Sequence, residues 1–405
     1  MREEYVTTFA GLIQQGVLQI GDGYRAKLQE LGGNGPLFLR AGLLTERGLD
    51  WARAERFHEA LAAKVESKLG RPGDTIITTK GNSIGRTGYV PVDAPAFVYS
   101  PHLSYWRSLD HRQLVPGFLR YWAQGPELVT QVRAMAHSTD MAPYLSLVDQ
   151  RRLHISLPTP SKQNAIAEVL GTLDDKIDLN SVVSKRADQL WQLHLESTIG
   201  SWDVNGDSLP AGWHSTPLSS LARFVNGRNF TKDATGSGRM AVRIAELNSG
   251  PGGSTVYNDI DVPDEHVAHP GDLLFAWSGS LTVRRWFRPE AIVNQHIFKV
   301  IPASRFATWF VHGHLLRLLP WYRQVAAGKA TTMGHIQRYH LDEPVLVPDE
   351  QTLTRLDAVC RPLWELALAA ERESLVLAEL RDTLLPKLLM GELRVGDVEK
   401  LASAS

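Results

Sequence analysis

The chain has 405 residues, 43% of them hydrophobic, which is too long for one ordinary core and predicts two globular domains. Lys and Arg total 43 against 44 Asp and Glu, so the net charge of -1 excludes nucleic-acid binding through bulk charge and leaves only a local patch. The single cysteine, Cys360, excludes an internal disulfide and a cysteine-rich zinc site. Without a charged-then-apolar leader or an apolar run of ~18 residues, we expect a cytoplasmic protein that does not enter membranes.

The first predicted domain covers residues 1–155. Helical spacing of apolar residues predicts a helix over residues 49–69. A Pro-Gly-Asp turn follows at residues 72–74, then a β-branched strand at residues 75–79 and a polar, glycine-bearing loop at residues 80–88. The glycines near residue 33 match neither a Walker nor a dinucleotide-binding fingerprint, so no phosphate cradle is expected there.

A long helix is predicted over residues 163–199, in a segment of residues 156–205 that ends in a turn-rich linker. Its apolar positions recur every three or four residues, pause at a polar stretch around Asn180 and Ser184, and then resume. At about 1.5 Å per residue the helix would be roughly 55 Å long, so it needs a partner along its length. The predicted seam residues are Ile166, Leu170, Leu173, Ile177 and Leu190.

The second predicted domain, residues 206–345, repeats the first. A second Pro-Gly-Asp turn occurs at residues 270–272, and 271 minus 73, 279 minus 81 and 289 minus 91 all equal 198. Two glycines and a closing proline therefore recur at one spacing, which predicts a duplicated unit.

A second long helix is predicted within residues 346–395, followed by a flexible tail at residues 396–405. The approaches to the two helices match at a spacing of 188, and Pro362 is expected to kink or restart the second helix. We expect the two helices to pack antiparallel, because each ends one half of the duplicated chain. The predicted seam residues of the second helix are Leu356, Cys360, Leu363, Ala367, Leu377, Leu380 and Leu384.

Residues with catalytic or metal-binding potential are sparse. His312 and His314 face different sides of a predicted apolar helix, and a solvated charged face explains Asp174 and Asp175 better than a carboxylate pair does. No nucleophile-base order, methyl-transfer motif, glycine-rich cofactor loop or nuclease core stands out. The sequence therefore predicts a non-catalytic protein that holds no metal and no cofactor of its own.

Polar loops are the candidates for DNA contact. Arg and Lys donors suit phosphates and guanine edges, and Asn suits adenine edges. The alternative is that Gly81 and Gly279 form hairpin turns and that the charges beside them are ordinary solvated residues. The candidate residues are Lys80, Asn82, Ser83, Arg86, Arg228, Asn229, Lys232, Ser278, Ser280, Arg284, Arg285, Lys329, Thr331 and Thr332.

The order of these motifs resembles the DNA specificity subunits of Type I restriction-modification systems. The matching segments are the two Pro-Gly-Asp strands, the Leu-Pro-Ala-Gly-Trp entry at residues 209–213, the Asn-Gln pair at residues 294–295, the Gly-Lys-Ala-Thr loop from residue 328, and the closing stretch at residues 380–393. The resemblance covers essentially the whole chain. It implies an α+β fold in which a pair of long antiparallel helices separates two target-recognition domains.

The same resemblance implies a function and partners. Each domain would read one half of a split double-stranded DNA target, and the helices would dock two methyltransferase subunits and possibly restriction subunits. S-adenosylmethionine would then be bound by the partner methyltransferase, not by this chain. A two-domain protein-protein scaffold without DNA reading is the alternative, which the near-neutral charge favours slightly.

Overall fold

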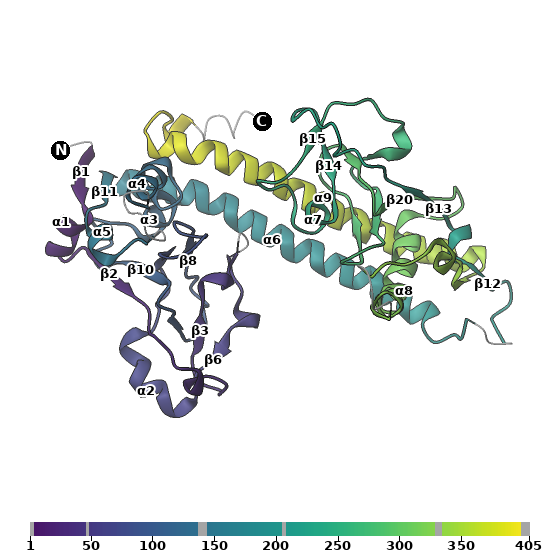
Figure 1. Ribbon diagram of the computed structural model, residues 1–405, viewed down its shortest axis with the longest axis horizontal. Coiled ribbons are helices and arrows are strands. Elements are labelled where there is room, and N and C mark those ends of the chain that lie inside the picture. Colours follow the sequence, from purple (N-terminus) through teal and green to yellow (C-terminus); the bar gives the residue numbers. More distant parts are fainter. Residues whose placement is uncertain (1–3, 46–47, 137–143, 205–207, 329–333, 398–405) are drawn as a thin grey trace. The chain divides into compact units, whose positions relative to one another are not determined.

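The protein is described by a computed structural model that covers residues 4–45, 48–136, 144–204, 208–328 and 334–397. The chain divides into two compact units (Figure 1). The first unit comprises residues 1–175 and 378–405, and the second comprises residues 176–377. Each unit therefore contains a globular part and a portion of each long helix.

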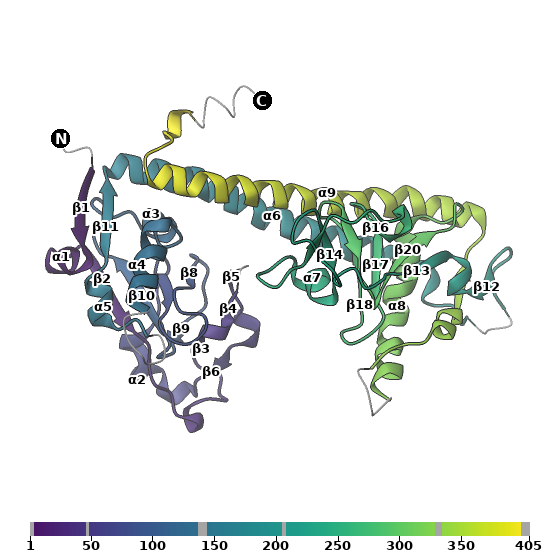
Figure 2. The same ribbon diagram turned by 45° about the horizontal axis from the view of Figure 1, so that its top comes forward.

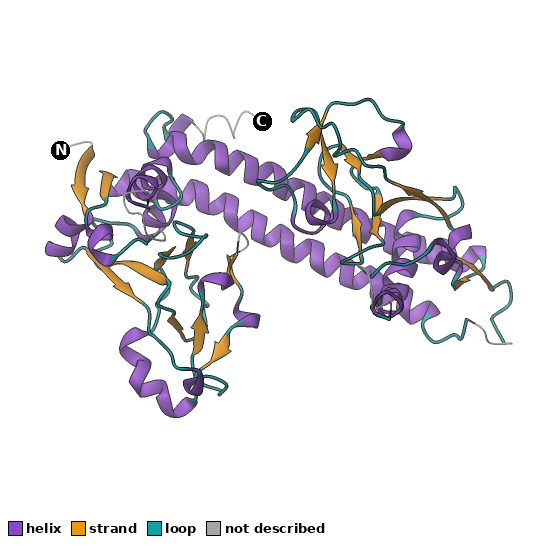
Figure 3. Cartoon of the chain, viewed as in Figure 1, coloured by secondary structure: helices purple, strands orange, loops and turns teal. Residues whose placement is uncertain are grey.

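The long helices are α6 (Pro160–Ile199) and α9 (Glu350–Leu389). Strands are confined to the globular parts (Figure 3). The first unit has helices α1 (Phe9–Gln14), α2 (Ala62–Val65), α3 (Pro116–Trp122), α4 (Pro126–Ala136) and α5 (Leu147–Arg151). Its strands are β1 (Glu4–Thr8), β2 (Leu18–Asp22), β3 (Leu37–Leu39), β4 (Leu44–Thr45), β5 (Gly48–Leu49), β6 (Glu55–Arg56), β7 (Thr75–Thr78), β8 (Thr87–Tyr89), β9 (Phe97–Tyr99), β10 (Leu103–Ser108) and β11 (His154–Pro158).

Among its described residues, the second unit adds the helices α7 (Ile244–Ser249) and α8 (Thr308–Ala327), and α8 packs against β18 and β20 (Figure 2). Its strands are β12 (His214–Pro217), β13 (Ala222–Asn226), β14 (Arg239–Val242), β15 (Tyr257–Asn258), β16 (Val267–Ala268), β17 (Leu273–Ala276), β18 (Thr282–Arg285), β19 (Ala291–Val293), β20 (Ile297–Pro302) and β21 (Pro344–Val347).

The two units share one strand topology. A four-stranded antiparallel sheet has the order β2-β10-β7-β8 in the first unit and β13-β20-β17-β18 in the second. Beside it, β3 pairs in parallel with β9, as β14 does with β19. The pairs β1-β11 and β12-β21 lead into α6 and α9 respectively. The duplication and the α+β fold class predicted from the sequence are thus confirmed.

The aspartate of each Pro-Gly-Asp turn binds a cation from the middle of the sheet. Asp74 is fully buried and pairs with Arg107 on β10 at 2.6 Å. In the second unit Asp272 pairs with Lys299 on β20 at 3.0 Å. The repeated motif therefore joins the turn before β7 to β10, and the turn before β17 to β20. This is a structural role.

The predicted helix over residues 49–69 is wrong. The segment instead forms short 3-10 turns, the strand β6 and the four-residue helix α2. Phe57 is fully buried and packs edge-on against Phe38 at 5.4 Å, and β6 pairs with β3. Sheet pairing and this aromatic contact override the helical spacing of the apolar residues.

In both units α6 and α9 pack antiparallel, as predicted. In the second unit, the Asn180 side chain donates to Glu373 at 2.8 Å, and further along the pair the thiol of Cys360 lies 3.7 Å from the Trp191 carbonyl oxygen. Residue numbers rise along one helix as they fall along the other. In the first unit, Arg381 donates to Asp174 at 2.8 Å. The helix α9 is continuous through Pro362, so it does not restart there.

Part of the predicted seam is wrong. Leu190 is 48% exposed and Leu380 is 43% exposed, so neither lies in the seam. Asn180 and Ser184, predicted to interrupt the seam, are buried within it. With 3.6 residues per turn, the face that carries Ser184 next presents Ala187 and Trp191, not Leu190.

The other predicted seam residues are buried or half-buried. Ile166, Leu170, Leu356, Cys360, Ala367 and Leu384 are buried. Leu173, Ile177, Leu363 and Leu377 are half-buried. Outside the prediction, Trp191, Leu195, Ile199 and Trp364 are also buried, and they join the core of the second unit.

Candidate nucleic-acid interface

In the first unit, three chain segments meet at the end of β7. The Thr79 amide donates to the His102 carbonyl at 2.9 Å, and the Leu145 amide donates to the Thr79 carbonyl at 3.0 Å. Lys80, the first residue of the predicted polar loop, forms an antiparallel bridge with Tyr144. The loop that follows β7 is therefore held between the turn before β10 and the segment that precedes α5.

The second unit repeats these contacts at the end of β17. The Trp277 amide donates to the His296 carbonyl at 3.1 Å, and the Ile336 amide donates to the Trp277 carbonyl at 3.1 Å. Ser278 bridges to His335 as Lys80 does to Tyr144. The main-chain geometry of the two loop clusters is thus the same.

A glycine allows a fourth segment to join each cluster. A Cβ atom on Gly23, after β2, would lie 2.1 Å from the Ser100 carbonyl oxygen. A Cβ atom on Gly227, after β13, would lie 2.1 Å from the Asn294 carbonyl oxygen. Real Cβ contacts are never this short, so each position requires glycine for the close approach of two backbones.

We call each cluster of four segments a loop edge. The loop edge of the first unit comprises residues 23–24, 79–86, 100–102 and 144–145. That of the second unit comprises residues 227–232, 277–281, 294–296 and 335–336. Exposed backbone and side-chain donors gathered at one end of a sheet are suited to contact a nucleic acid.

The two loop edges differ in their side chains. In the first unit, the Lys80 ammonium lies 4.4 Å from the centre of the Tyr144 ring, a cation-π contact. In the second unit, the Trp277 ring lies 5.1 Å from His296 and 6.4 Å from His335. The bridged position of the first loop edge thus carries a lysine stacked on a tyrosine ring. The second loop edge carries an indole ring beside two imidazole rings.

His296 has a backbone conformation that residues other than glycine rarely adopt. Its φ is +73°, and its Nδ1 is buried without a hydrogen-bond partner among the described residues. Next to it, the Trp277 indole donates to the Asn226 side chain at 2.8 Å. Unusual backbone and unpaired polar atoms concentrate at functional sites.

The structure places most of the predicted DNA-contact residues on these edges. Arg86 is exposed and donates to the Leu44 carbonyl at 3.0 Å. Ser278 is buried within its edge, and Arg284 is exposed on β18. Asn82, Arg228, Asn229, Lys232 and Ser280 are exposed, and Lys80 and Ser83 are half-buried. Lys329, Thr331 and Thr332 lie outside the described residues.

The predicted DNA contact of Arg285 is wrong, because this residue is buried against the two long helices. Its guanidinium binds Asp188 on α6 at 3.1 Å and Glu371 on α9 at 3.0 Å, and it lies 4.9 Å from the centre of the Trp364 ring. Successive residues of a strand point to opposite faces, so Arg284 is left in solvent. Arg285 therefore anchors the second sheet to the helices and is not available for DNA.

Sequence reasoning missed Tyr144, Trp277, His296 and His335. The only signal was that His102 and His296 each end a three-residue turn before β10 and β20. The other residues of those turns differ, and their spacing of 194 departs from the 198 of the Pro-Gly-Asp motif. The equivalence of His102 and His296 is recognisable only from the pairing of β7 with β10 and of β17 with β20.

The described residues contain no group of three potential metal ligands, and none of their helices is long and apolar enough to cross a membrane. His312 and His314 are buried in α8, and burial lowers the pKa of each to about 3. Both imidazoles are therefore neutral core groups at neutral pH.

Comparison with known proteins found a curated relative and a solved structure of similar fold. The chain is 25% identical over 277 residues to the Type I restriction enzyme MjaIX specificity subunit of Methanocaldococcus jannaschii, a match that covers 61% of this chain. The aligned region spans 62% of that relative's length. No family model matches the chain.

Among solved structures, the S subunit of a Type I restriction-modification system from M. genitalium superposes with a TM-score of 0.57. The superposition covers 95% of this chain and 96% of that one, at 16% sequence identity. The chain has the fold of a Type I specificity subunit. The resemblance inferred from the sequence motifs is confirmed, and the match of the fold runs through both units and both long helices.

Proposed function

We propose that the chain is the DNA-recognition subunit of a Type I restriction-modification complex, with one loop edge for each half of a bipartite double-stranded target. The observation that carries this proposal is the duplicated loop edge. Both units build it with the same main-chain contacts and fill it with different side chains. Two such surfaces suit a target with two different half-sites.

The chemistry of each edge fits base and phosphate contact. Lys80 offers a charged donor in the first unit, and exposed Arg228 and Asn229 offer guanidinium and amide groups in the second. These groups match guanine, adenine and phosphate acceptors. Methylation and cleavage are assigned to partner subunits, and S-adenosylmethionine to the partner methyltransferase.

The helices supply a surface for those partners. In the second unit, the outward faces of α6 and α9 expose large apolar side chains: Leu179, Val182, Leu190, Leu193, Val359, Leu366 and Val376. At about 100° per residue, the four on α6 lie within about 80° of one another around the helix. An exposed apolar stripe of this kind marks a protein-protein interface. We assign it to the docking of a methyltransferase subunit; two such subunits, and possibly restriction subunits, would complete the complex.

The docking proposal is tested by co-expression with the cognate methyltransferase. Leu190→Asp combined with Leu193→Asp should abolish the complex in size-exclusion chromatography. Val148→Asp, at a residue 58% exposed on α5, is the matched control and should leave the complex intact. If the double variant assembles normally, the stripe is not the docking surface.

The recognition proposal is tested with the assembled complex. Methylation should require both halves of the target, and scrambling either half should abolish it. A complex that assembles but methylates or binds all DNA duplexes equally would leave the chain as a protein-protein scaffold.

A further inference from the structure

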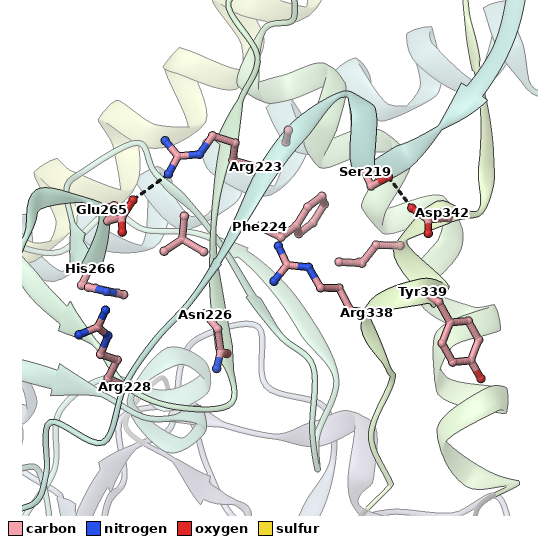
Figure 4. A pocket seen from close by; sticks show the side chains of 13 residues that line it. Ser219, Arg223, Phe224, Asn226, Arg228, Glu265, His266, Arg338, Tyr339 and Asp342 are labelled. Atoms are coloured by element: carbon pink, nitrogen blue, oxygen red, sulfur yellow. Dashed lines mark hydrogen bonds and ion pairs between the residues drawn. The ribbon is translucent and has the colours of Figure 1, made fainter.

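A groove in the second unit adjoins its loop edge. The groove has a volume of about 800 Å³ and lies between β13 and the 3-10 segment Arg338–Asp342 (Figure 4). Asn226 and Arg228, at the end of β13, line the groove, and Arg228 also belongs to the loop edge. The groove therefore continues the candidate DNA surface.

The charges in the groove leave two guanidinium groups without a carboxylate. Arg223 is paired with Glu265 at 2.7 Å, and Ser219 donates to Asp342 at 2.5 Å. Arg228 and Arg338 are exposed, and in the described part of the chain neither has an ion-pair partner. Unpaired guanidinium groups in a groove provide a site for an anion.

A buried histidine in the wall of the groove points to the same conclusion. His266 is 3% exposed, and within the described ranges neither of its ring nitrogens has a hydrogen-bond partner. Figure 4 shows its ring beside the Arg228 side chain. Burial, and then the charge of Arg228, lower the pKa of His266, so the ring is neutral at pH 7 and keeps one N–H donor. Buried polar groups are normally satisfied, so a donor without an acceptor marks a site that a ligand completes.

We propose that this groove binds a phosphate of the DNA backbone, held mainly by Arg338 and Arg228. The inference rests on the proposed function and adds a contact that carries affinity and register but no sequence information. The first unit does not carry an arginine at the position that matches Arg228. The residue that follows its glycine is Tyr24, whose hydroxyl donates to Glu30 at 3.0 Å. The proposed contact through Arg228 therefore has no counterpart at the matching position of the first unit.

The test uses the assembled complex and the variants Arg338→Ala and Arg338→Lys. Binding is measured over a salt series on the target and on a duplex with the second half-site scrambled. Loss of one phosphate contact should reduce the slope of log K against log salt by about 1 and weaken binding roughly tenfold at 0.1 M salt, by the same factor on both DNAs. Arg338→Lys keeps the charge and should retain most of the slope.

Arg305→Ala is the matched control. Arg305 is an exposed arginine of the same unit that lies outside the groove and pairs with Glu350 at 3.6 Å. Its removal should leave the salt slope unchanged. Melting temperatures establish that each variant is folded.

An unchanged salt slope in Arg338→Ala would overturn the proposal, and so would a loss confined to DNA with the intact second half-site, which would mean a base contact. A further arm adds inorganic phosphate. If phosphate raises the melting temperature of the wild type but not of Arg338→Ala, while both bind DNA equally, the groove serves a free anion and the DNA assignment is wrong.

These outcomes are separate from failure of the proposed function. A wild-type complex that does not distinguish target from scrambled DNA ends the sequence-reading proposal. The phosphate contact would still be measurable as the salt slope on any duplex.

Discussion

The two units share a framework and differ at the surface that the framework presents. In both, a buried or half-buried aspartate of the Pro-Gly-Asp turn binds a cation of the central strand, Arg107 in the first unit and Lys299 in the second. At the loop edges, Lys80 and Ser278 occupy equivalent positions but have little chemistry in common. Packing constraints hold the framework, whereas the exposed edge can vary at little cost to folding, as the proposed reading of two different half-sites requires.

The largest expected effect concerns the helix seam in the second unit. Trp191 is fully buried, and Trp191→Ala should lower the free energy of unfolding of that unit by about 3–5 kcal/mol through lost burial and a cavity. Leu190→Ala, at the exposed neighbouring position, should change it by less than about 0.5 kcal/mol. Denaturant unfolding monitored by hydrogen exchange separates the units; equal effects of the two variants would contradict the observed seam.

The repeated ion pair should contribute more to the free energy of unfolding in the first unit than in the second. Asp74→Ala leaves Arg107 buried without its carboxylate, which should cost about 3–5 kcal/mol of stability. Asp272→Ala should cost less, because the Asp272 side chain is 28% exposed and the Lys299 ammonium also donates to the Val267 carbonyl at 2.6 Å. Hydrogen exchange of each variant gives the two values, and a larger loss in Asp272→Ala would reverse the comparison.

The second unit should also lose stability in acid through its buried histidines. Burial lowers the pKa of His312 and of His314 from 6.5 to about 3, so both take up protons on unfolding. Their contribution is fully present above pH 6.5 and declines as the pH falls from 6.5 toward 3, by about 2 kcal/mol for each histidine at pH 5. His312→Gln should flatten the pH dependence of unfolding of the second unit between pH 6.5 and 5. An unchanged slope would show that this histidine is not the source.

Periodicity and internal repetition predicted much of the fold. The extents of both long helices, their antiparallel packing and the duplicated strand-turn motif all followed from the spacing of apolar residues, glycines and prolines. The seam itself was misassigned around Leu190, because α6 carries apolar residues on two faces and only one of them meets α9. Composition cannot tell which of two apolar faces of a helix is buried against its neighbour.

The candidate site was predicted less completely than the fold. Loops with Gly, Lys and Arg were recognisable as polar surface, but Arg285 was not recognisable as buried, since its partners Asp188 and Glu371 are about 90 residues away in each direction. Trp277 and His296 are brought together by the pairing of β17 with β20. Contacts of this kind depend on strand register, which the sequence of either segment does not contain.

The central claim is that each loop edge reads its own half-site, and DNA binding by the complex with single substitutions tests it most directly. Lys80→Ala in the first loop edge and Asn229→Ala in the second, where Asn229 is exposed, are each measured on the intact target and on targets with either half scrambled. Loss of a base contact should cost about 1–3 kcal/mol of binding free energy. Lys80→Ala should lose its effect only when the first half-site is scrambled, and Asn229→Ala only when the second is scrambled. Losses that do not depend on which half is intact would contradict the account.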